Sequence, residues 1–227
     1  MNASQARQRV RDSRLWQVYG RRRYAILFYA LLLTLLVMPI VATIGLSQVF
    51  IKILLAGCLL SAVMPNATKG TRAILFSAVL LLFIANSASD RGYLQVNPGL
   101  VLALVGVIGL VTAAGTLRFA VTAKSVDSET LYASLGTYLL AGVFFGQIYW
   151  SLEQLWPGSI VGPDKTTELS CVYYSFVTLA TLGYGDFLPR TDIARGVATF
   201  EVIGGQLFLA VMVARLIGLF SEPEPKD

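Results

Sequence analysis

Long apolar runs separated by short polar segments make up most of the chain. A helix of about 20 apolar residues crosses the hydrocarbon layer of a bilayer, and six runs approach or exceed that length. A further apolar stretch near 168–180 carries no charge after Glu168 and predicts a helix too short to span. The pattern therefore predicts spanning helices near 25–45, 46–64, 72–87, 99–121, 131–152 and 193–220. Because the second and third runs are short, a chain with five spans in total, or with shifted spans in its first half, remains the alternative.

The composition agrees with a membrane setting. Hydrophobic residues make up 56% of the 227 positions and charged residues only 14%. An ordinary soluble fold of this size cannot keep so much apolar surface from water. The chain is therefore predicted to be an all-α membrane protein, with the short helix near 168–180 entering the membrane between the last two spans and leaving on the same side.

The basic residues predict how the chain is oriented. Before the first predicted span there are seven arginines and a single acidic residue, Asp12. Basic residues concentrate on the cytoplasmic side of membrane proteins, so both termini are placed in the cytoplasm of a multi-pass protein of the cell membrane. The six-span topology then puts 13 basic residues inside and four outside, the latter being Arg91, Lys165, Arg190 and Arg195. The net charge of +5 reflects this asymmetry, and neither a nucleic acid nor a soluble substrate is expected as a partner.

The most informative segment follows the short helix and reads Thr-Leu-Gly-Tyr-Gly-Asp over residues 181–186. A cation that enters hydrocarbon must have its water shell replaced, and backbone carbonyls can do this if successive peptides turn toward one axis. That arrangement needs alternating backbone conformations, which Gly183 and Gly185 adopt without steric hindrance. Thr181 can add a hydroxyl oxygen, Tyr184 is expected to point away and brace the loop, and Asp186 is expected to close the outer mouth.

This hexapeptide closely resembles the selectivity filter of the potassium-channel superfamily. The resemblance is best over about residues 131–220, and the stretch 173–180 is similar to the family's pore helix. It implies a potassium-selective channel in which the filter is formed by Thr181, Leu182, Gly183, Tyr184 and Gly185, with K⁺ held by the carbonyls of the first four. A Gly-Tyr-Gly turn followed by Asp is also found in surface turns, but its place between two long apolar helices favours the filter.

One filter segment per chain predicts the assembly. A ring of carbonyls needs several loops around an axis, and no internal repeat supplies them. The chain is therefore expected to form a homotetramer surrounded by membrane lipids. An enzyme is not expected, because there is no histidine and no nucleophile–base pattern, and no cofactor is expected beyond the permeant ion. A less selective cation channel and a non-conducting accessory subunit remain alternatives.

The resemblance also suggests a division of the chain. Residues 1–23 form a basic cytoplasmic tail, 24–122 a four-helix membrane domain, 129–220 the pore domain with outer helix, pore helix, filter and inner helix, and 221–227 a short cytoplasmic tail. An arrangement of six spans with one pore loop between the last two resembles that of voltage-gated channels, here in a potassium channel of prokaryotic type. However, Arg118 is the single basic residue of the fourth span, so no charged voltage sensor is expected. In that span, Gly106, Gly109 and Ala113 predict a close helix contact.

Several residues are predicted to support the filter. Tyr173 and Tyr174 match the family's aromatic cuff, and their hydroxyls are expected to hydrogen bond Asp186 and Tyr184, respectively. Glu201 lies inside the last span, where an unpaired carboxylate is costly. It is therefore expected to face protein and accept hydrogen bonds behind the pore helix, with ion binding as the alternative.

The last span carries the candidate gating residues. Gly204 and Gly205 are predicted either to form a hinge, where a helix can bend, or to pack closely as a small face. Helical spacing places Gln206, Leu209 and Val213 on one face that is a candidate for lining the cavity below the filter.

Overall fold

The computed structural model describes residues 3–44, 97–123 and 128–220 and is mostly helical. In these residues, four helices are long and apolar enough to cross a membrane. They correspond to the predicted spans at 25–45, 99–121, 131–152 and 193–220, whereas those at 46–64 and 72–87 lie outside the described residues. By length and apolar composition, the four candidate spans are Arg22–Val41, Pro98–Thr122, Ser128–Leu155 and Asp192–Arg215.

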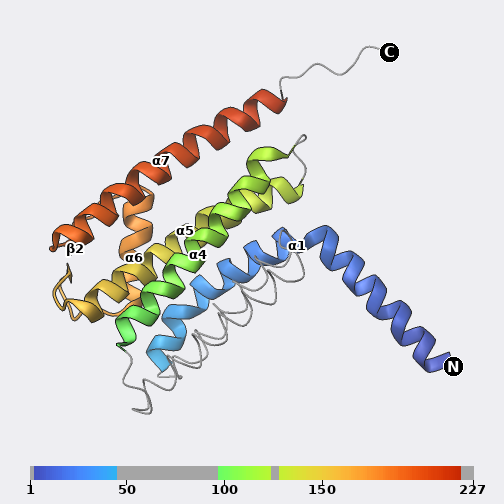
Figure 1. Ribbon diagram of the computed structural model, residues 1–227, viewed down its shortest axis with the longest axis horizontal. Coiled ribbons are helices and arrows are strands. Elements are labelled where there is room, and N and C mark those ends of the chain that lie inside the picture. The colour runs from blue at the N-terminus through green and yellow to red at the C-terminus, as the bar shows by residue number, and fades with distance from the viewer. Residues whose placement is uncertain (1–2, 45–96, 124–127, 221–227) are drawn as a thin grey trace.

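The first helix, α1 (Ala3–Ile44), begins about 20 residues earlier than the apolar pattern predicts. The residues before the apolar run include seven arginines and three glutamines, which are good helix formers that a search for apolar runs does not detect. The backbone leaves helical geometry at Arg22 (φ −126°, ψ 25°), and the segment before it turns away from the other helices (Figure 1). After this kink, the amide of Tyr24 donates to Oε2 of Glu129 at 3.0 Å, which fastens the apolar half of α1 to the start of α5.

Helices α4 (Pro98–Thr122) and α5 (Ser128–Leu155) lie side by side (Figure 1). Gly106 and Gly109 are both buried in their contact, and a Cβ atom on Gly109 would lie 2.1 Å from the ring of Phe144. Farther along the same contact, the hydroxyls of Thr116 and Thr137 are 2.8 Å apart. The close approach predicted from small residues is therefore confirmed, because only glycine leaves room for the neighbouring ring.

Helix α6 (Glu168–Leu179) lies between α5 and α7 (Asp192–Phe220), in the position predicted for the short helix (Figure 1). Its start is fixed by a capping box. The Thr167 hydroxyl accepts from the Ser170 amide at 3.1 Å, and the Ser170 hydroxyl accepts from the Thr167 amide at 2.7 Å. Glu168 in the first turn suits the positive end of the helix dipole.

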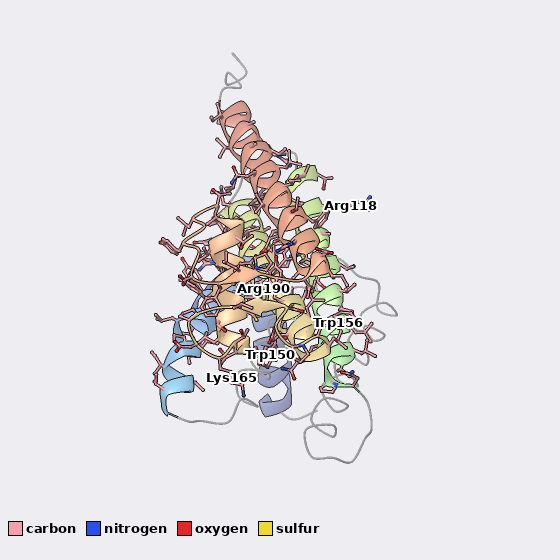
Figure 2. The ribbon with its side chains drawn as sticks, turned by 90° about the vertical axis from the view of Figure 1, so that its left-hand side faces the viewer. Arg118, Trp150, Trp156, Lys165 and Arg190 are labelled. Atoms are coloured by element: carbon pink, nitrogen blue, oxygen red, sulfur yellow. The ribbon has the colours of Figure 1, made fainter. Side chains whose placement is uncertain are left out.

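Two short strands close the ends of the segment that contains α6. β1 (Ile160–Val161) and β2 (Leu188–Pro189) pair antiparallel, and the Arg190 amide donates to the Ser159 carbonyl at 2.8 Å. The chain before α6 is thus tied to the chain after residues 181–186. Trp156 and Lys165 lie toward one end of the molecule and Arg118 toward the other (Figure 2). A tryptophan at one end suits a membrane–water interface.

Helix α7 is held mainly near its first turns. Arg195 Nε donates to the Pro189 carbonyl at 3.3 Å, and Ala194 and Ala198 are buried against the neighbouring elements. Farther along, most of its large apolar side chains that the structure describes are exposed in the single chain. Near its other end, Arg215 donates to the carbonyl of Ala123, the residue that caps the end of α4.

Candidate functional site

The backbone of residues 181–186 alternates in handedness. Thr181, Gly183 and Gly185 have positive φ values of 58°, 55° and 78°. Glycine adopts this region freely, whereas a β-branched residue does so at a cost of about 1–2 kcal/mol. Sequence reasoning assigned the unusual conformations to the two glycines and missed Thr181, which is the one non-glycine with positive φ among the described residues.

The loop is anchored through its amides. The N–H of Thr181 donates to the Thr178 carbonyl and that of Leu182 to the Val177 carbonyl, both at 2.9 Å. The Gly183 N–H also points to the Val177 carbonyl, at 3.4 Å. The hydrogen bonds found among the described residues thus use the N–H groups of the loop and leave its carbonyl oxygens for another partner. All six residues of the loop are exposed in the single chain.

The two tyrosines of the predicted cuff have different partners. Tyr173 is hydrogen bonded to Asp186, which together with burial raises the pKa of the tyrosine above its ordinary value. Tyr174 is 6% exposed, and burial raises its pKa, although a hydrogen bond with Thr178 acts in the opposite direction. The pairing of Tyr174 with Tyr184 is not made within the single chain, where Tyr184 is 66% exposed, and it stays a prediction.

Helix α6 lies directly against α5 through two glycines that sequence reasoning did not single out. A Cβ atom on Gly146 would lie 2.6 Å from Cα of Val172, so the two backbones are in contact, and Gly142 faces an aromatic ring of α6. Next to them, Gln147 Nε2 donates to Oε1 of Glu168 at 2.5 Å. The signal that could have found this contact is the spacing of two glycines four residues apart on an apolar helix.

Glu201 is fully buried between α5, α6 and α7. Its Oε2 accepts a hydrogen bond from the Tyr149 hydroxyl at 2.6 Å, and its Oε1 lies 2.5 Å from the Ser175 hydroxyl. Ser175 also contacts the Gly142 carbonyl at 2.7 Å. The carboxyl group therefore lies behind α6 and links three helices. Sequence reasoning predicted Glu201 but not Ser175 or Tyr149, although both are hydroxyls within apolar helices.

The candidate gating residues differ in their surroundings. A Cβ atom on Gly205 would lie 2.8 Å from Cδ1 of Leu179, whereas one on Gly204 would meet nothing within 4 Å. Close packing is therefore observed at Gly205 and not at Gly204, and the hinge stays a prediction. The remaining three, Gln206, Leu209 and Val213, are exposed in the single chain, and their place in a cavity is likewise untested.

No group of three His, Cys, Asp or Glu side chains that could hold a metal ion occurs in the part of the chain that the structure describes. The oxygen-rich feature of the site is the backbone of the loop. Cys171, in α6, is fully buried, and burial raises the pKa of its thiol, so it is suited to packing and not to nucleophilic chemistry.

Residues 134–222, which include α6, the loop and α7, match the protein family described as "Ion channel". This match supports the assignment of the chain to the ion-channel superfamily. It is a match to a channel family and not to an enzyme family, and it agrees with apolar helices suited to a multi-pass membrane protein.

Curated relatives are similar over parts of their length. A Rhodopseudomonas palustris protein that carries the name of a potassium channel is 38% identical over 63 residues, which cover 27% of this chain and 15% of that protein. An inward rectifier potassium channel of Paramagnetospirillum magnetotacticum is 29% identical over 92 residues, covering 39% of this chain and 28% of the channel. The human voltage-gated potassium channel regulatory subunit KCNG1 is 32% identical over 59 residues, covering 26% of this chain and 12% of the subunit. The chain thus spans less than a third of each relative, and no solved structure matches it.

Proposed function

We propose that the chain is one subunit of a homotetrameric potassium channel, which conducts K⁺ passively through a pore lined by the carbonyls of Thr181, Leu182, Gly183 and Tyr184. Channels of this kind replace the hydration shell of the ion with rings of backbone carbonyls. Four copies of the loop around one axis would supply such rings, with Gly185 and Asp186 at the outer mouth. The name of the inward rectifier relative, a potassium channel, agrees with this choice of ion.

The observation that carries the proposal is the alternating positive φ at residues 181, 183 and 185. When left-handed and right-handed backbone conformations alternate along a chain, successive carbonyl groups can point to the same side. A ring of carbonyls around an ion requires this arrangement. The loop also follows the C-terminal end of α6, where the negative end of the helix dipole favours a cation. The loop and much of α7 are exposed in the single chain, and neighbouring copies arranged around one axis would cover them.

The wider architecture is proposed on the sequence pattern. It has six spans with α6 as a re-entrant pore helix, no charged voltage sensor, and both termini in the cytoplasm of a cell membrane. Arg118 and Lys165 lie toward opposite ends of the molecule, which suits their assignment to opposite sides (Figure 2).

The test is uptake of rubidium, a potassium substitute, and of sodium into liposomes that contain the purified full chain. Gly183→Ala places a side chain where φ is +55°, at a cost of about 1–2 kcal/mol in each of four chains. Gly196→Ala is the matched control, because a Cβ atom there also meets nothing within 4 Å but the backbone is helical.

We expect rubidium uptake without sodium uptake, lost in Gly183→Ala and kept in Gly196→Ala. Equal uptake of rubidium and sodium would instead identify a less selective cation channel. If Gly183→Ala took up rubidium as fast as the native chain, the loop would not be the filter.

A second candidate function is that of an accessory subunit that does not conduct by itself. It is favoured by one observation, the name of the human relative as a regulatory subunit. In that case the purified chain would take up no rubidium, and uptake would appear only with a conducting partner subunit of the potassium-channel family in the same liposomes.

A further inference from the structure

Glu201 belongs to a chain of three close oxygen–oxygen pairs, to which the hydroxyl groups of Tyr149 and Ser175 supply only two protons. Three oxygen–oxygen distances lie between 2.5 and 2.7 Å: Tyr149 to Glu201, Glu201 to Ser175, and Ser175 to the Gly142 carbonyl. At such distances each pair needs one proton between its oxygens. Tyr149 and Ser175 carry one hydroxyl proton each, and a carbonyl carries none. The third proton must therefore lie on Glu201.

The direction of each hydrogen bond then follows. Tyr149 donates to Oε2 of Glu201, protonated Oε1 donates to the Ser175 hydroxyl, and Ser175 donates to the Gly142 carbonyl. If Glu201 were ionised, either the Glu201–Ser175 pair or the Ser175–Gly142 pair would be two acceptors in contact without a proton. Such a contact is repulsive, and it is costly where no water can enter.

The surroundings agree with a neutral carboxyl group. Glu201 is 0% exposed, and within the described residues no basic side chain forms an ion pair with it. The ionisable groups found to interact with it are three phenols, Tyr138 and Tyr149 of α5 and Tyr174 of α6. Phenols are uncharged at neutral pH and offer no counter-charge. A buried carboxylate without a counter-charge is far less stable than the acid.

We infer that Glu201 is a protonated positioning residue: as a hydrogen-bond donor it fastens α6 to α5 and α7, and loss of its proton releases α6. The effect on conduction rests on the proposed function, because α6 positions the loop at residues 181–186. The stabilisation is present while the proton is bound and is lost as the pH rises. The bonds themselves do not depend on whether the chain conducts.

The first test is the infrared spectrum of the purified full chain at neutral pH. The difference spectrum between the native chain and Glu201→Gln should contain the carbonyl band of a protonated carboxylic acid. Glu153→Gln is the matched control, because Glu153 accepts two backbone N–H groups, from Gly158 and Ile160, and should lose a carboxylate band instead. A carboxylate band in the Glu201 difference spectrum would overturn the inference.

The second test is thermal unfolding of the full chain between about pH 5 and pH 9. In Glu201→Gln the amide donates to Ser175 and accepts from Tyr149, so it reproduces the protonated acid. Its melting temperature should equal that of the native chain at low pH and should not fall with the native value as the pH rises. A Glu201→Gln chain that melts below the native chain throughout would overturn the inference.

Two serine variants distinguish the loss of the hydrogen bonds between helices from the loss of a buried hydroxyl in general. Ser175→Ala should lower the melting temperature by several degrees, whereas Ser151→Ala should not. Ser151 is equally buried, but among the described residues its hydroxyl bonds only the Ile148 carbonyl of its own helix. Rubidium uptake, if present, should fall with rising pH in the native chain and stay constant in Glu201→Gln. Absence of all uptake would count against the proposed function alone, since the spectra and the melting curves would still report the proton.

Discussion

The two adjacent glycines of α7 offer a sharp test of how the site is packed. A Cβ atom on Gly205 would lie 2.8 Å from Cδ1 and 2.9 Å from the carbonyl oxygen of Leu179, the last residue of α6. Ordinary contacts between such atoms are about 3.5–4.0 Å, so α6 and α7 must separate by about 0.6–1.2 Å to admit it. A Cβ atom on Gly204 meets nothing within 4 Å.

These distances set the expected magnitudes. Overpacking of this kind costs about 1–3 kcal/mol, whereas replacing glycine by alanine inside a helix gains about 0.5–1 kcal/mol. Gly204→Ala should therefore be stabilised by about 0.5–1 kcal/mol, and Gly205→Ala should be less stable than Gly204→Ala by about 1–3 kcal/mol. At roughly 2–4 °C per kcal/mol, their melting temperatures should differ by at least about 2 °C.

Thermal unfolding of both variants measures the difference, and rubidium uptake measures its effect on the loop. Leu179 precedes Thr181 by two residues, so Gly205→Ala should also reduce uptake, while Gly204→Ala should not. Equal rises in melting temperature would show that the contact with Leu179 is not formed. If Gly204→Ala were stabilised but did not conduct, conduction would require bending at Gly204, and the expectation that this variant conducts like the native chain would be refuted.

Two further predictions concern the ends of α6. Tyr173→Phe removes the hydroxyl that is bonded to Asp186. The pKa of Tyr173 is raised in the folded chain, so the hydroxyl's contribution to the free energy of unfolding is fully present below about pH 10. This contribution is lost as the pH rises through the pKa of the folded chain. The melting temperatures of native and variant chains should therefore differ at neutral pH and converge in strong alkali, and a difference that persisted there would contradict this reasoning. Gln147→Leu leaves Glu168 without its donor and should lower the free energy of unfolding by about 1–3 kcal/mol, measured against Ser151→Ala; equal stabilities of the two variants would refute it.

Local patterns predicted the elements near the site because their causes are local. Residues 168–179 form α6 since the stretch is apolar, has a capping threonine before it and contains no helix breaker. The glycines at 183 and 185 similarly carry their own conformational freedom. Thr181 was missed because its left-handed backbone comes from the hydrogen bonds to α6 and not from its side chain.

The support of α6 depends on residues far apart in sequence. Glu201 meets Tyr149 across 52 positions and Ser175 across 26. A periodic pattern shows that a carboxyl group lies within an apolar helix, but it does not identify which distant hydroxyls reach it. The polar beginning of α1 was missed for the opposite reason, since a helix without an apolar face gives no periodic signal.

Helix α7 is attached near its first turns and again near its far end through Arg215, so it can act as a lever between the two attachments. Its first turns are fastened near β2, and Glu201 is fastened behind α6, so the fulcrum lies near that end. Arg215 stands 14 residues beyond Glu201, a distance of about 21 Å along a helix, and a tilt of about 5° at the fulcrum would carry it through about 2 Å. That far arm is the part which grips the last turn of α4 through Ala123. A tilt of α7 that is too small to break its contacts beside α6 would therefore move Arg215, next to α4, by a distance comparable to the length of a hydrogen bond.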